Sequence, residues 1–372
     1  MKVCILGTAW PYRGGLTAMN ERLAQEFIAQ GHEVEIVTFT LQYPSIFFPG
    51  QSQFDDRPKP PFQIKRMLNS INPFSWLRVG RYLKKSAPDL IVVKFWIPFM
   101  APAFGTVLRM ARKNGKTKVV SILDNIIPHE KRLFDFQLSS YFVKAADGFI
   151  TLSKSVLEDL GQFDKTKPRK FSPHPVYDHF GDVDSKENAR VKLGLDKDGK
   201  YLLFFGFIRD YKGLDLLLKA MNDARVRDAG IRCIVAGEYY SNQEEYDQLI
   251  DELEIRESLD LFTEFIPDKE IAHYFNAADC VVQPYKTATQ SGVTQIAYHF
   301  EKPMIVTNVG GLPEIVPHGE VGYVTHVDPL SIADHILEFY RGDINRFAPK
   351  IKEKQKEYSW TTMLNNVLSL VD

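Results

Sequence analysis

The stretch Gly206-Phe207-Ile208-Arg209-Asp210-Tyr211-Lys212-Gly213 decides the fold of this chain. It follows an apolar run, Tyr201–Phe205, and precedes an amphipathic pattern, Leu214–Met221, so a strand, a loop and a helix are expected in turn. Open α/β sheets bind their ligands at the carboxyl ends of the strands. Arg209 and Lys212 place two cations at such an edge beside a helix start, which suits a diphosphate. The alternative is a surface loop that happens to be basic.

The same alternation of strands and helices runs through the whole chain. In the first half the expected strands are Lys2–Leu6, Glu33–Thr38, Leu90–Val93, Val119–Leu123 and Gly148–Leu152, with a helix over Thr17–Gln30. In the second half they are Tyr201–Phe205, Arg232–Ala236, Asp260–Phe265, Cys280–Gln283, Met304–Thr307 and Gly322–Thr325. Strands that alternate with helices predict parallel sheets. We therefore predict an α/β protein of two doubly wound, Rossmann-like domains facing each other across a cleft.

The joint between the domains is expected near Phe171–Ser185. This segment contains Pro173 and Pro175 and has no clear period, which is typical of a linker. The N-terminal domain would then comprise residues 1–175, and the second domain would begin at residue 176. His174 is expected to pack or hydrogen-bond at the hinge.

Composition narrows the class of protein. The chain has 372 residues, of which 44% are hydrophobic and 25% charged, and its formal net charge is −1. These values are ordinary for a globular protein and give no electrostatic case for nucleic acid. Cys4, Cys233 and Cys280 lie in apolar runs and fit no disulfide or zinc spacing, so we expect buried thiols. We recognise no signal peptide, and Lys94 and Arg109 interrupt the longest apolar region, so a cytoplasmic protein is expected.

Two further loops offer backbone amides to an anion. Gly14-Gly15 follows the first strand, where glycine lets the backbone approach a ligand and leaves amides free at a helix start. Its alternative is a flexible turn. The run Thr289-Gln290-Ser291-Gly292-Val293 precedes the helix Thr294–Phe300, with Thr289 or Ser291 as the N-cap. Simple capping is the alternative there, although it does not account for the whole run.

Carboxylates and a histidine follow other strands. Glu314 lies just after Pro313, which suits the first turn of a short helix. Its carboxylate either bonds a ribose diol or is merely favoured near a helix N-terminus. Asp124 and His129 lie in one loop after a strand of the first domain, and either would act on an acceptor hydroxyl. An ordinary connecting loop is the alternative.

We predict no metal site. Asp182-Val183-Asp184 has the spacing of the DxD motif found in metal-dependent nucleotide-sugar enzymes, but it lies in the linker and not at a strand end. Asp184 or Ser185 is expected instead to cap the helix Lys186–Leu193.

The stretch Arg66–Lys85 suggests a second kind of contact. It interleaves Arg66, Arg78, Arg81, Lys84 and Lys85 with Phe74, Trp76 and Leu77. Such a helix would lie on an anionic membrane surface near a lipid-linked acceptor, so the protein would be peripheral at the inner face of the membrane. The alternative is a solvated helix whose aromatic residues pack on its own domain.

Together these residues resemble the retaining glycosyltransferases of family 4 (glycosyl transferases group 1), which have the GT-B architecture. The resemblance covers nearly the whole chain, and the order and spacing of its motifs are specific. Its segments are the loop Pro11–Gly15, Gly31–Val34, Arg209–Gly213, Gly237-Glu238, Phe265–Pro267, Ala278-Asp279, Pro284-Tyr285, Pro303–Val306 and Gly310–Val316.

The resemblance implies a nucleoside-diphosphate sugar as donor substrate, held mainly by the C-terminal domain without a cofactor. Arg209 and Lys212 would bind the diphosphate with the amides of Gly14-Gly15 and of Ser291-Gly292-Val293. The implied donor site also includes Glu238, Gln290 and Glu314, and the implied acceptor side includes Asp124 and His129. The C-terminal domain would span residues 176–355, and residues 356–372 would cross back as a helix onto the first domain.

The sequence departs from the family at the donor site. The family carries two glutamates eight residues apart before the proline that corresponds to Pro303, and Ala288 and Ile296 occupy those positions here. Phe207 occupies the position of the usual arginine, and Arg209 follows two residues later. These departures leave the donor sugar open.

The resulting hypothesis is sugar transfer to an acceptor hydroxyl with retention of configuration, in polysaccharide or glycolipid biosynthesis. Arg209, Lys212 and helix N-terminal amides would stabilise the departing diphosphate. The acceptor proton could pass to a leaving phosphate oxygen. The alternatives are a non-catalytic nucleotide-sugar-binding subunit, a phosphorylase or a sugar-nucleotide epimerase of the same architecture, and a dehydrogenase, whose glycine fingerprint neither glycine loop matches.

Overall fold

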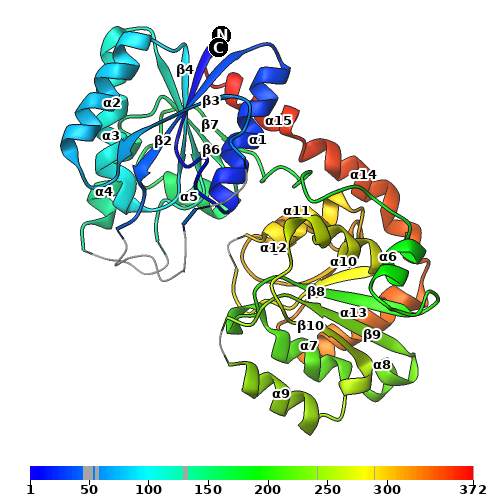
Figure 1. Ribbon diagram of the computed structural model, residues 1–372. Coiled ribbons are helices and arrows are strands. Elements are labelled where there is room, and N and C mark those ends of the chain that lie inside the picture. The colour runs from blue at the N-terminus through cyan, green and yellow to red at the C-terminus, as the bar shows by residue number, and fades with distance from the viewer. Residues whose placement is uncertain (45–52, 55–57, 129–132, 241, 289, 372) are drawn as a thin grey trace. The chain divides into compact units, whose positions relative to one another are not determined.

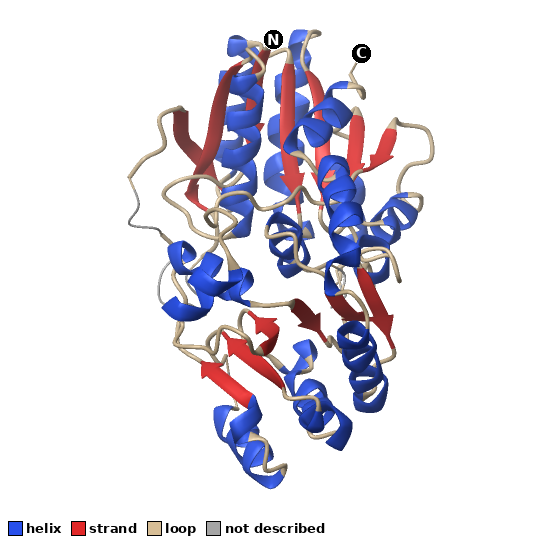
Figure 2. Cartoon of the chain, turned by 90° about the vertical axis from the view of Figure 1, so that its right-hand side faces the viewer, coloured by secondary structure: helices blue, strands red, loops and turns tan. Residues whose placement is uncertain are grey.

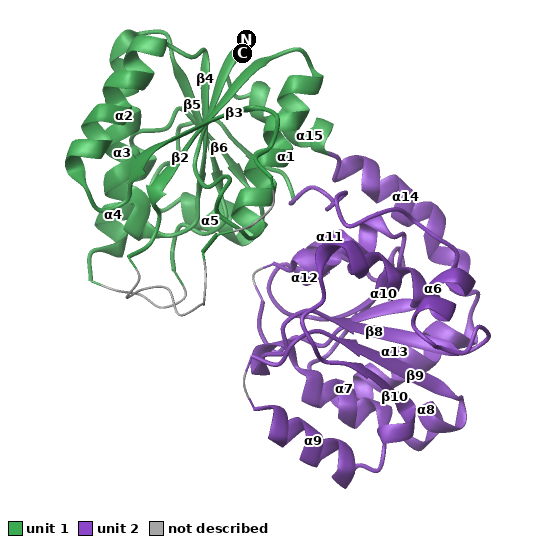
Figure 3. Ribbon diagram, viewed as in Figure 1, with its two compact units in different colours: residues 1–173, 360–372 green, residues 174–359 purple. Residues whose placement is uncertain are grey.

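The computed structural model divides the chain into two compact units (Figure 3). The first comprises residues 1–173 with 360–372, and the second comprises residues 174–359. The structure describes the chain except for residues 45–52, 55–57, 129–132, 241, 289 and 372. Each unit contains a parallel sheet covered by helices, which confirms the predicted α/β class of two Rossmann-like domains.

The first sheet has the strand order β3-β2-β1-β4-β5-β6-β7 among the described residues, and all its pairs are parallel. Its strands are β1 (Lys2–Leu6), β2 (Glu33–Leu41), β3 (Gln63–Asn69), β4 (Leu90–Phe95), β5 (Lys118–Leu123), β6 (Gly148–Thr151) and β7 (Arg169–Phe171). The central strands are buried on both faces, which is why they appear in the sequence as continuous apolar runs.

Helices cover both faces of this sheet. They are α1 (Gly15–Ala29), α2 (Pro73–Ser86), α3 (Ala101–Ala111), α4 (Asp135–Val143), α5 (Lys154–Leu160) and α15 (Trp360–Leu368), with 3-10 turns η2 (Pro98–Met100) and η3 (Arg112–Asn114). The helices α1 and α15 pack on one face, and α2, α3 and α4 lie side by side on the other (Figure 1). Figure 2 shows the strands of this unit side by side with helices lying over them.

The second sheet has the order β10-β9-β8-β11-β12-β13 and is also parallel. Its strands are β8 (Lys200–Phe205), β9 (Ile231–Ala236), β10 (Leu259–Phe262), β11 (Cys280–Gln283), β12 (Met304–Thr307) and β13 (Gly322–Thr325). The order changes direction at β8, where a doubly wound sheet opens a crevice for a ligand. The loop Gly206–Gly213 begins at the carboxyl end of that strand.

The helices of the second unit form two groups that pack on opposite faces (Figure 1). One group is α7 (Leu214–Met221), α8 (Ala224–Asp228), α9 (Gln243–Glu252) and α13 (Pro329–Arg341), and the other is α6 (Lys186–Lys192), α10 (Ile271–Ala277), α11 (Gly292–His299) and α14 (Ala348–Glu357). The short helix α12 (Leu312–Ile315) and the 3-10 turns η4 (Asp210–Lys212), η5 (Arg256–Ser258), η6 (Asp268–Glu270) and η7 (Ile344–Phe347) complete the unit.

Some local expectations are confirmed and others are wrong. The three cysteines are free and buried, and Ser185 and Ser291 cap α6 and α11. The expected linker starts too early, since Phe171 belongs to β7. Arg66 lies in β3 and not in a helix, and the basic helix α2 begins only at Pro73.

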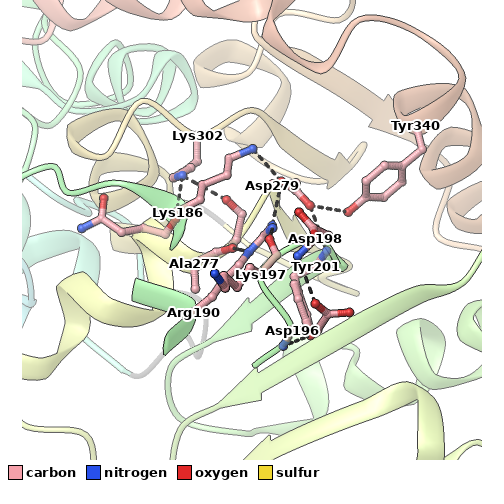
Figure 4. A network of polar contacts seen from close by, with 12 residues as sticks. Lys186, Arg190, Asp196, Lys197, Asp198, Tyr201, Ala277, Asp279, Lys302 and Tyr340 are labelled. Carbon is pink, nitrogen blue, oxygen red and sulfur yellow. Dashed lines mark hydrogen bonds and ion pairs between the residues drawn. The ribbon is translucent and has the colours of Figure 1, made fainter. Parts of the chain in front are cut away.

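A buried polar cluster fixes the amino edge of the second sheet (Figure 4). Asp279, just before β11, accepts hydrogen bonds from the Lys186 ammonium (2.6 Å), the Arg190 guanidinium (3.1 Å), the Tyr201 amide (2.9 Å) and the Tyr340 hydroxyl (3.2 Å). The carboxylate therefore ties α6 and α13 to two strands of the sheet.

Lys302 belongs to the same cluster. Its ammonium donates to the carbonyl oxygens of Asn276 (3.1 Å) and Ala278 (3.0 Å). Burial, together with the charge of Lys186, lowers the pKa of Lys302 to about 7 even though Asp279 favours its charged form.

No helix in the described part of the chain is both long and apolar enough to cross a membrane.

Candidate functional site

The loop after β8 folds Lys212 back beneath the strand end. Gly206 has φ 94°, and a Cβ atom built on it would lie 2.9 Å from the Lys212 Nζ. The turn η4 then carries Lys212 inward, and Gly213, at φ 69°, starts α7. Glycine at position 206 therefore provides both the backbone conformation and the space that the lysine side chain occupies.

Lys212 is a buried cation that lacks a counter-charge in the described part of the chain. It is only 9% exposed, and it makes no hydrogen bond or ion pair with the residues that the structure describes. The Tyr285 ring centroid lies 5.9 Å from its Nζ. Burial, reinforced by the neighbouring charge of Arg209, lowers the pKa of Lys212 to about 8. A buried ammonium beside a second cation is costly, and a bound anion would offset that cost.

Arg209 is held from the other side by the strand end of β9. Its guanidinium lies 4.0 Å from the ring centroid of Tyr240, and its buried Nε has no hydrogen-bond partner among the described residues. Glu238 is exposed, and its carbonyl oxygen accepts the Ile208 amide at 2.9 Å. The loops after β8 and β9 therefore run together, and they place Glu238 next to the segment that carries both cations.

The loop after β11 closes the same edge. A Cβ on Gly213 would lie 2.0 Å from the Pro284 carbonyl oxygen, so the two loops touch through their backbones. The Ser291 hydroxyl lies 3.2 Å from that of Tyr285 and accepts the Val293 amide at 3.2 Å. Gly206 lies close to Val293, because a Cβ at position 206 would be 4.0 Å from the valine Cγ2. The structure thus brings the N-terminus of α11 to the Gly206–Lys212 loop.

Another lysine of this edge has a structural partner instead. Lys286 pairs with Asp210 at 2.6 Å and with Asp215 at 3.0 Å. These carboxylates help to hold its pKa above the ordinary value, against the effect of burial. Lys286 therefore fastens the loop after β11 to η4 and α7, and Lys212 is left for a ligand.

The remaining predicted donor residues lie on the same edge of the second unit. Gln290 is half-buried directly before the cap of α11. Glu314 is half-buried in α12, which follows β12, and its amide donates to the Gly311 carbonyl oxygen at 3.2 Å. Thr289 lies outside the described residues.

In the first unit, Gly14 and Gly15 begin α1. Gly14 has φ 101° and gives the 15-residue helix no side-chain cap, so its first amides are open to an acceptor. A hollow of about 190 Å³ adjoins this helix start. Its lining consists of Thr8, Tyr12, Arg13, Gly14, Gly15, Leu16, Gln42, Tyr43 and Gln53.

Asp124 lies one residue beyond β5 and forms an ion pair that the sequence did not reveal. Its Oδ1 is 3.1 Å from the Nζ of Lys94 in β4. Burial raises the pKa of Asp124, and the charge of Lys94 opposes that rise. His129, the other predicted acceptor-side residue, lies outside the described residues.

Three residues near the carboxyl edges of the two sheets were not predicted as site residues from the sequence. Lys94 interrupts the apolar strand Leu90–Phe95, and the sequence predicted from it only the absence of a membrane span. Tyr240 follows β9 and lies over Arg209, which the sequence could not show. Gln283 ends β11, and both polar atoms of its buried amide lack partners among the described residues.

Family models match both halves of the chain. Residues 13–172 match the model described as Glycosyltransferase Family 4, and residues 185–358 match the model described as Glycosyl transferases group 1.

The chain resembles curated proteins over different lengths. A D-inositol 3-phosphate glycosyltransferase of Frankia alni is 32% identical over 48% of this chain and 47% of its own length. A second, from Corynebacterium urealyticum, is 26% identical, and the match spans 68% of this chain and 62% of the relative. An uncharacterized glycosyltransferase of Methanocaldococcus jannaschii is 25% identical over 100% of this chain and 97% of its own. The chain thus spans about half to two thirds of the first two relatives.

Solved structures share the fold over the whole chain. Sucrose-phosphate synthase from Thermosynechococcus elongatus aligns with a TM-score of 0.72 and 16% identity, covering 100% of this chain and 98% of the other. Anabaena HepE in complex with UDP aligns with a TM-score of 0.74 and 16% identity, covering 99% of each chain. At such identities the likeness establishes architecture only.

Proposed function

We propose that this chain, a glycosyltransferase of GT-B type, transfers a sugar from a nucleoside-diphosphate sugar to an acceptor hydroxyl with retention of configuration, in polysaccharide or glycolipid biosynthesis. The observation that carries the proposal is Lys212, a buried ammonium without a counter-charge among the described residues, next to Arg209 at the carboxyl edge of the second sheet. A diphosphate would supply the missing negative charge at the point where doubly wound sheets bind ligands.

The reaction needs stabilisation of the departing diphosphate. Arg209 and Lys212 would neutralise the charge that develops as the bond to the anomeric carbon breaks, and first-turn amides of α11 at Gly292 would add to it. Because these groups are fixed before the reaction, they cost little reorganisation when the charge appears. The proton of the acceptor hydroxyl needs a base, either an oxygen of the leaving phosphate or the Asp124 carboxylate.

The solved structures suggest which donor to test first. Structures of Anabaena HepE contain UDP and UDP-glucose. We therefore propose a uridine diphosphate sugar as the first donor to test, although Ala288 and Ile296 replace the acidic pair of the family. GDP and ADP sugars complete the panel.

The test compares the wild-type protein with a double variant, Arg209→Ala with Lys212→Ala. We expect a nucleoside diphosphate to raise the melting temperature of the wild type, and turnover to release the free diphosphate when an acceptor is added. The double variant should lose both effects and keep its fold. The matched control is Lys350→Ala with Lys352→Ala, which removes the same charge from α14 of the same unit.

Three outcomes would count against the proposal. Normal turnover in the double variant would refute the assigned site. Thermal stabilisation without turnover, across all donors and acceptors, would favour a non-catalytic nucleotide-sugar-binding subunit. A product in which the sugar remains attached to its nucleotide would indicate an epimerase. A sugar phosphate as product would indicate a phosphorylase.

We further propose that helix α2 contacts an anionic membrane surface. Residues 66–85 contain five basic residues and no acidic one, in a chain of net charge −1. Within α2, the exposed Phe74, Arg78, Arg81 and Lys85 follow each other at spacings of four, three and four, which places them on one stripe of the helix. Phe74 is 81% exposed, so its ring does not pack on its own domain.

The first unit exposes further apolar side chains besides Phe74. Leu133, 89% exposed, and Phe134 precede α4, which follows β5. Because α2 follows β3 and α4 follows β5 in a parallel sheet, the starts of both helices, with Phe74 and Phe134, lie at the carboxyl edge of that sheet. Apolar side chains at an edge with cations behind them suit a bilayer of anionic lipid.

Vesicle sedimentation tests this contact. We expect binding to phosphatidylglycerol vesicles, weak binding to phosphatidylcholine, and loss of binding at high salt. Replacing Arg78 and Arg81 with Gln should weaken binding about 30-fold, at about 1 kcal/mol for each cation. The Lys350→Ala, Lys352→Ala protein is the control, and equal losses in the two proteins would refute a specific surface.

A further inference from the structure

Lys94 is an unusual residue for its place in the fold. It is the one charged residue of β4, whose sequence is Leu-Ile-Val-Val-Lys-Phe, and its side chain is only 4% exposed. The side chain lies on the face of the sheet that α1 covers, and its ammonium lies against the thioether of Met19. The ammonium pairs with the Asp124 carboxylate, whose Oδ1 lies 3.1 Å away.

The ion pair is asymmetric at its carboxylate. The amide of Asp124 donates to the Phe95 carbonyl oxygen at 2.9 Å, which fixes the backbone one residue beyond β5. Oδ1 is fully buried and faces Lys94, whereas the side chain as a whole is 24% exposed. The exposed part of the side chain therefore excludes Oδ1, and Oδ2 makes no hydrogen bond or ion pair with the described residues.

Stability alone does not account for this pair. Removing two charges from water is costly, and apolar side chains of similar size often serve a buried position as well or better. The neighbours of Lys94 on this face, Val92 and Ile122 among them, are such side chains. The charged pair also lies at the carboxyl edge of its sheet, where a ligand would meet Oδ2.

We propose that Lys94 is a positioning residue for sugar transfer, because it holds Asp124 ionised and oriented so that Oδ2 takes the proton of the acceptor hydroxyl. This inference rests on the proposed function. In the step, the acceptor O–H proton moves to Oδ2, and the acceptor oxygen bonds to the anomeric carbon on the face from which the diphosphate departs, so that configuration is retained. The bond from that carbon to the diphosphate oxygen breaks, and its electron pair leaves with the diphosphate.

The role of Lys94 follows from the burial of its partner. Burial alone would favour the neutral carboxylic acid, which cannot accept a proton. Among the described residues, Lys94 is the charged group that acts on Asp124, and it favours the carboxylate. A positioned general base contributes about 100-fold or more to a rate, so loss of Lys94 should be visible in kcat.

The experiment compares Lys94→Met, Lys94→Arg and Asp124→Asn with a matched control, Lys65→Met. Lys65 of β3 also pairs with a buried carboxylate of the same sheet, Glu35, at 3.1 Å. We expect Lys94→Met to lower kcat about 100-fold, to leave the donor KM within about twofold, and to shift the acid limb of the kcat–pH profile upward. Lys94→Arg should recover much of the loss, and Lys65→Met should change kcat less than about threefold.

The double variant Lys94→Met, Asp124→Asn should be no slower than Asp124→Asn alone, because both changes remove the same function, proton abstraction by Asp124. Melting temperatures of all variants separate this effect from loss of folding. Equal kcat losses in Lys94→Met and Lys65→Met, or independent losses in the double variant, would overturn the inference while wild-type turnover still supported the proposed function. A wild type without turnover on any donor would refute the proposed function and the inference with it.

Discussion

Binding of a nucleoside diphosphate should weaken as the pH rises through 8. Lys212 has its pKa lowered to about 8 by burial and by Arg209, so the free protein loses this charge in a range where an exposed lysine keeps it. The diphosphate itself is fully ionised there, since its last proton leaves near pH 6. The bound ligand needs the ammonium form, and binding at higher pH must therefore take up a proton.

The size of the effect follows from the titration. With a pKa of about 8, the charged fraction of Lys212 falls from about 90% at pH 7 to about 9% at pH 9. If the complex contains only charged Lys212, affinity falls about tenfold over this range, or about 1.4 kcal/mol. Lys212→Met should remove this pH dependence and weaken binding at pH 7 by about 10- to 100-fold, the range for a hydrogen bond to a charged group.

Isothermal titration calorimetry measures both quantities. Titrations at pH 7, 8 and 9, in buffers with different enthalpies of ionisation, give the affinity and the number of protons taken up, about 0.5 at pH 8. Lys286→Met is the control, because Lys286 belongs to the same edge but already pairs with Asp210 and Asp215. A flat affinity from pH 7 to 9, or the same slope in Lys212→Met, would refute the assignment of Lys212 to the diphosphate.

Two further changes test the packing of Gly213 at the start of α7 and the buried cluster around Asp279 at the amino edge of the second sheet. Gly213→Ala would place a Cβ 2.0 Å from the Pro284 carbonyl oxygen at φ 69°, and it should lower the free energy of unfolding by about 3 kcal/mol in urea denaturation. Gly230→Ala has a similar φ of 65° with open space around the new atom, so it should cost only about 1 kcal/mol, and equal costs would argue against the steric contact. Lys302 has a folded-state pKa of about 7, below its unfolded value, so the wild type should gain up to about 1.4 kcal/mol of stability per pH unit above pH 7. Lys302→Met should flatten that curve, and parallel curves would contradict the cause.

Much of the fold could be predicted because its central strands are buried on both faces. Such strands appear as apolar runs between amphipathic helices, and β1, β4, β8 and β12 begin and end close to where those runs do. The edge strands lack this signal. The sequence of β3 is Gln-Ile-Lys-Arg-Met-Leu-Asn, with partly exposed positions between buried ones, and β7 has only three residues. Their pairing depends on neighbours distant in sequence.

The candidate site was predictable in its backbone and much less so in its charges. Glycines after a strand and before a helix mark loops where backbones approach closely, and Gly206 and Gly213 make such approaches. Which cation faces which carboxylate depends on loops that meet only in the folded chain. The pairing of Lys286 with η4 and α7, and of Lys94 with the loop after β5, therefore could not be predicted from spacing.

Three buried lysines show how partners decide function. Lys302 donates to two carbonyl oxygens and lies beside Asp279, so the fold itself satisfies it. Lys94 shares its charge with one carboxylate that keeps its other oxygen open. Among the residues that the structure describes, Lys212 has only another cation, Arg209, for a charged neighbour. The sequence shows three lysines and nothing that ranks them. The structure ranks them by their partners. A buried charge that the fold leaves uncompensated destabilises the protein, and a bound anion would offset that cost.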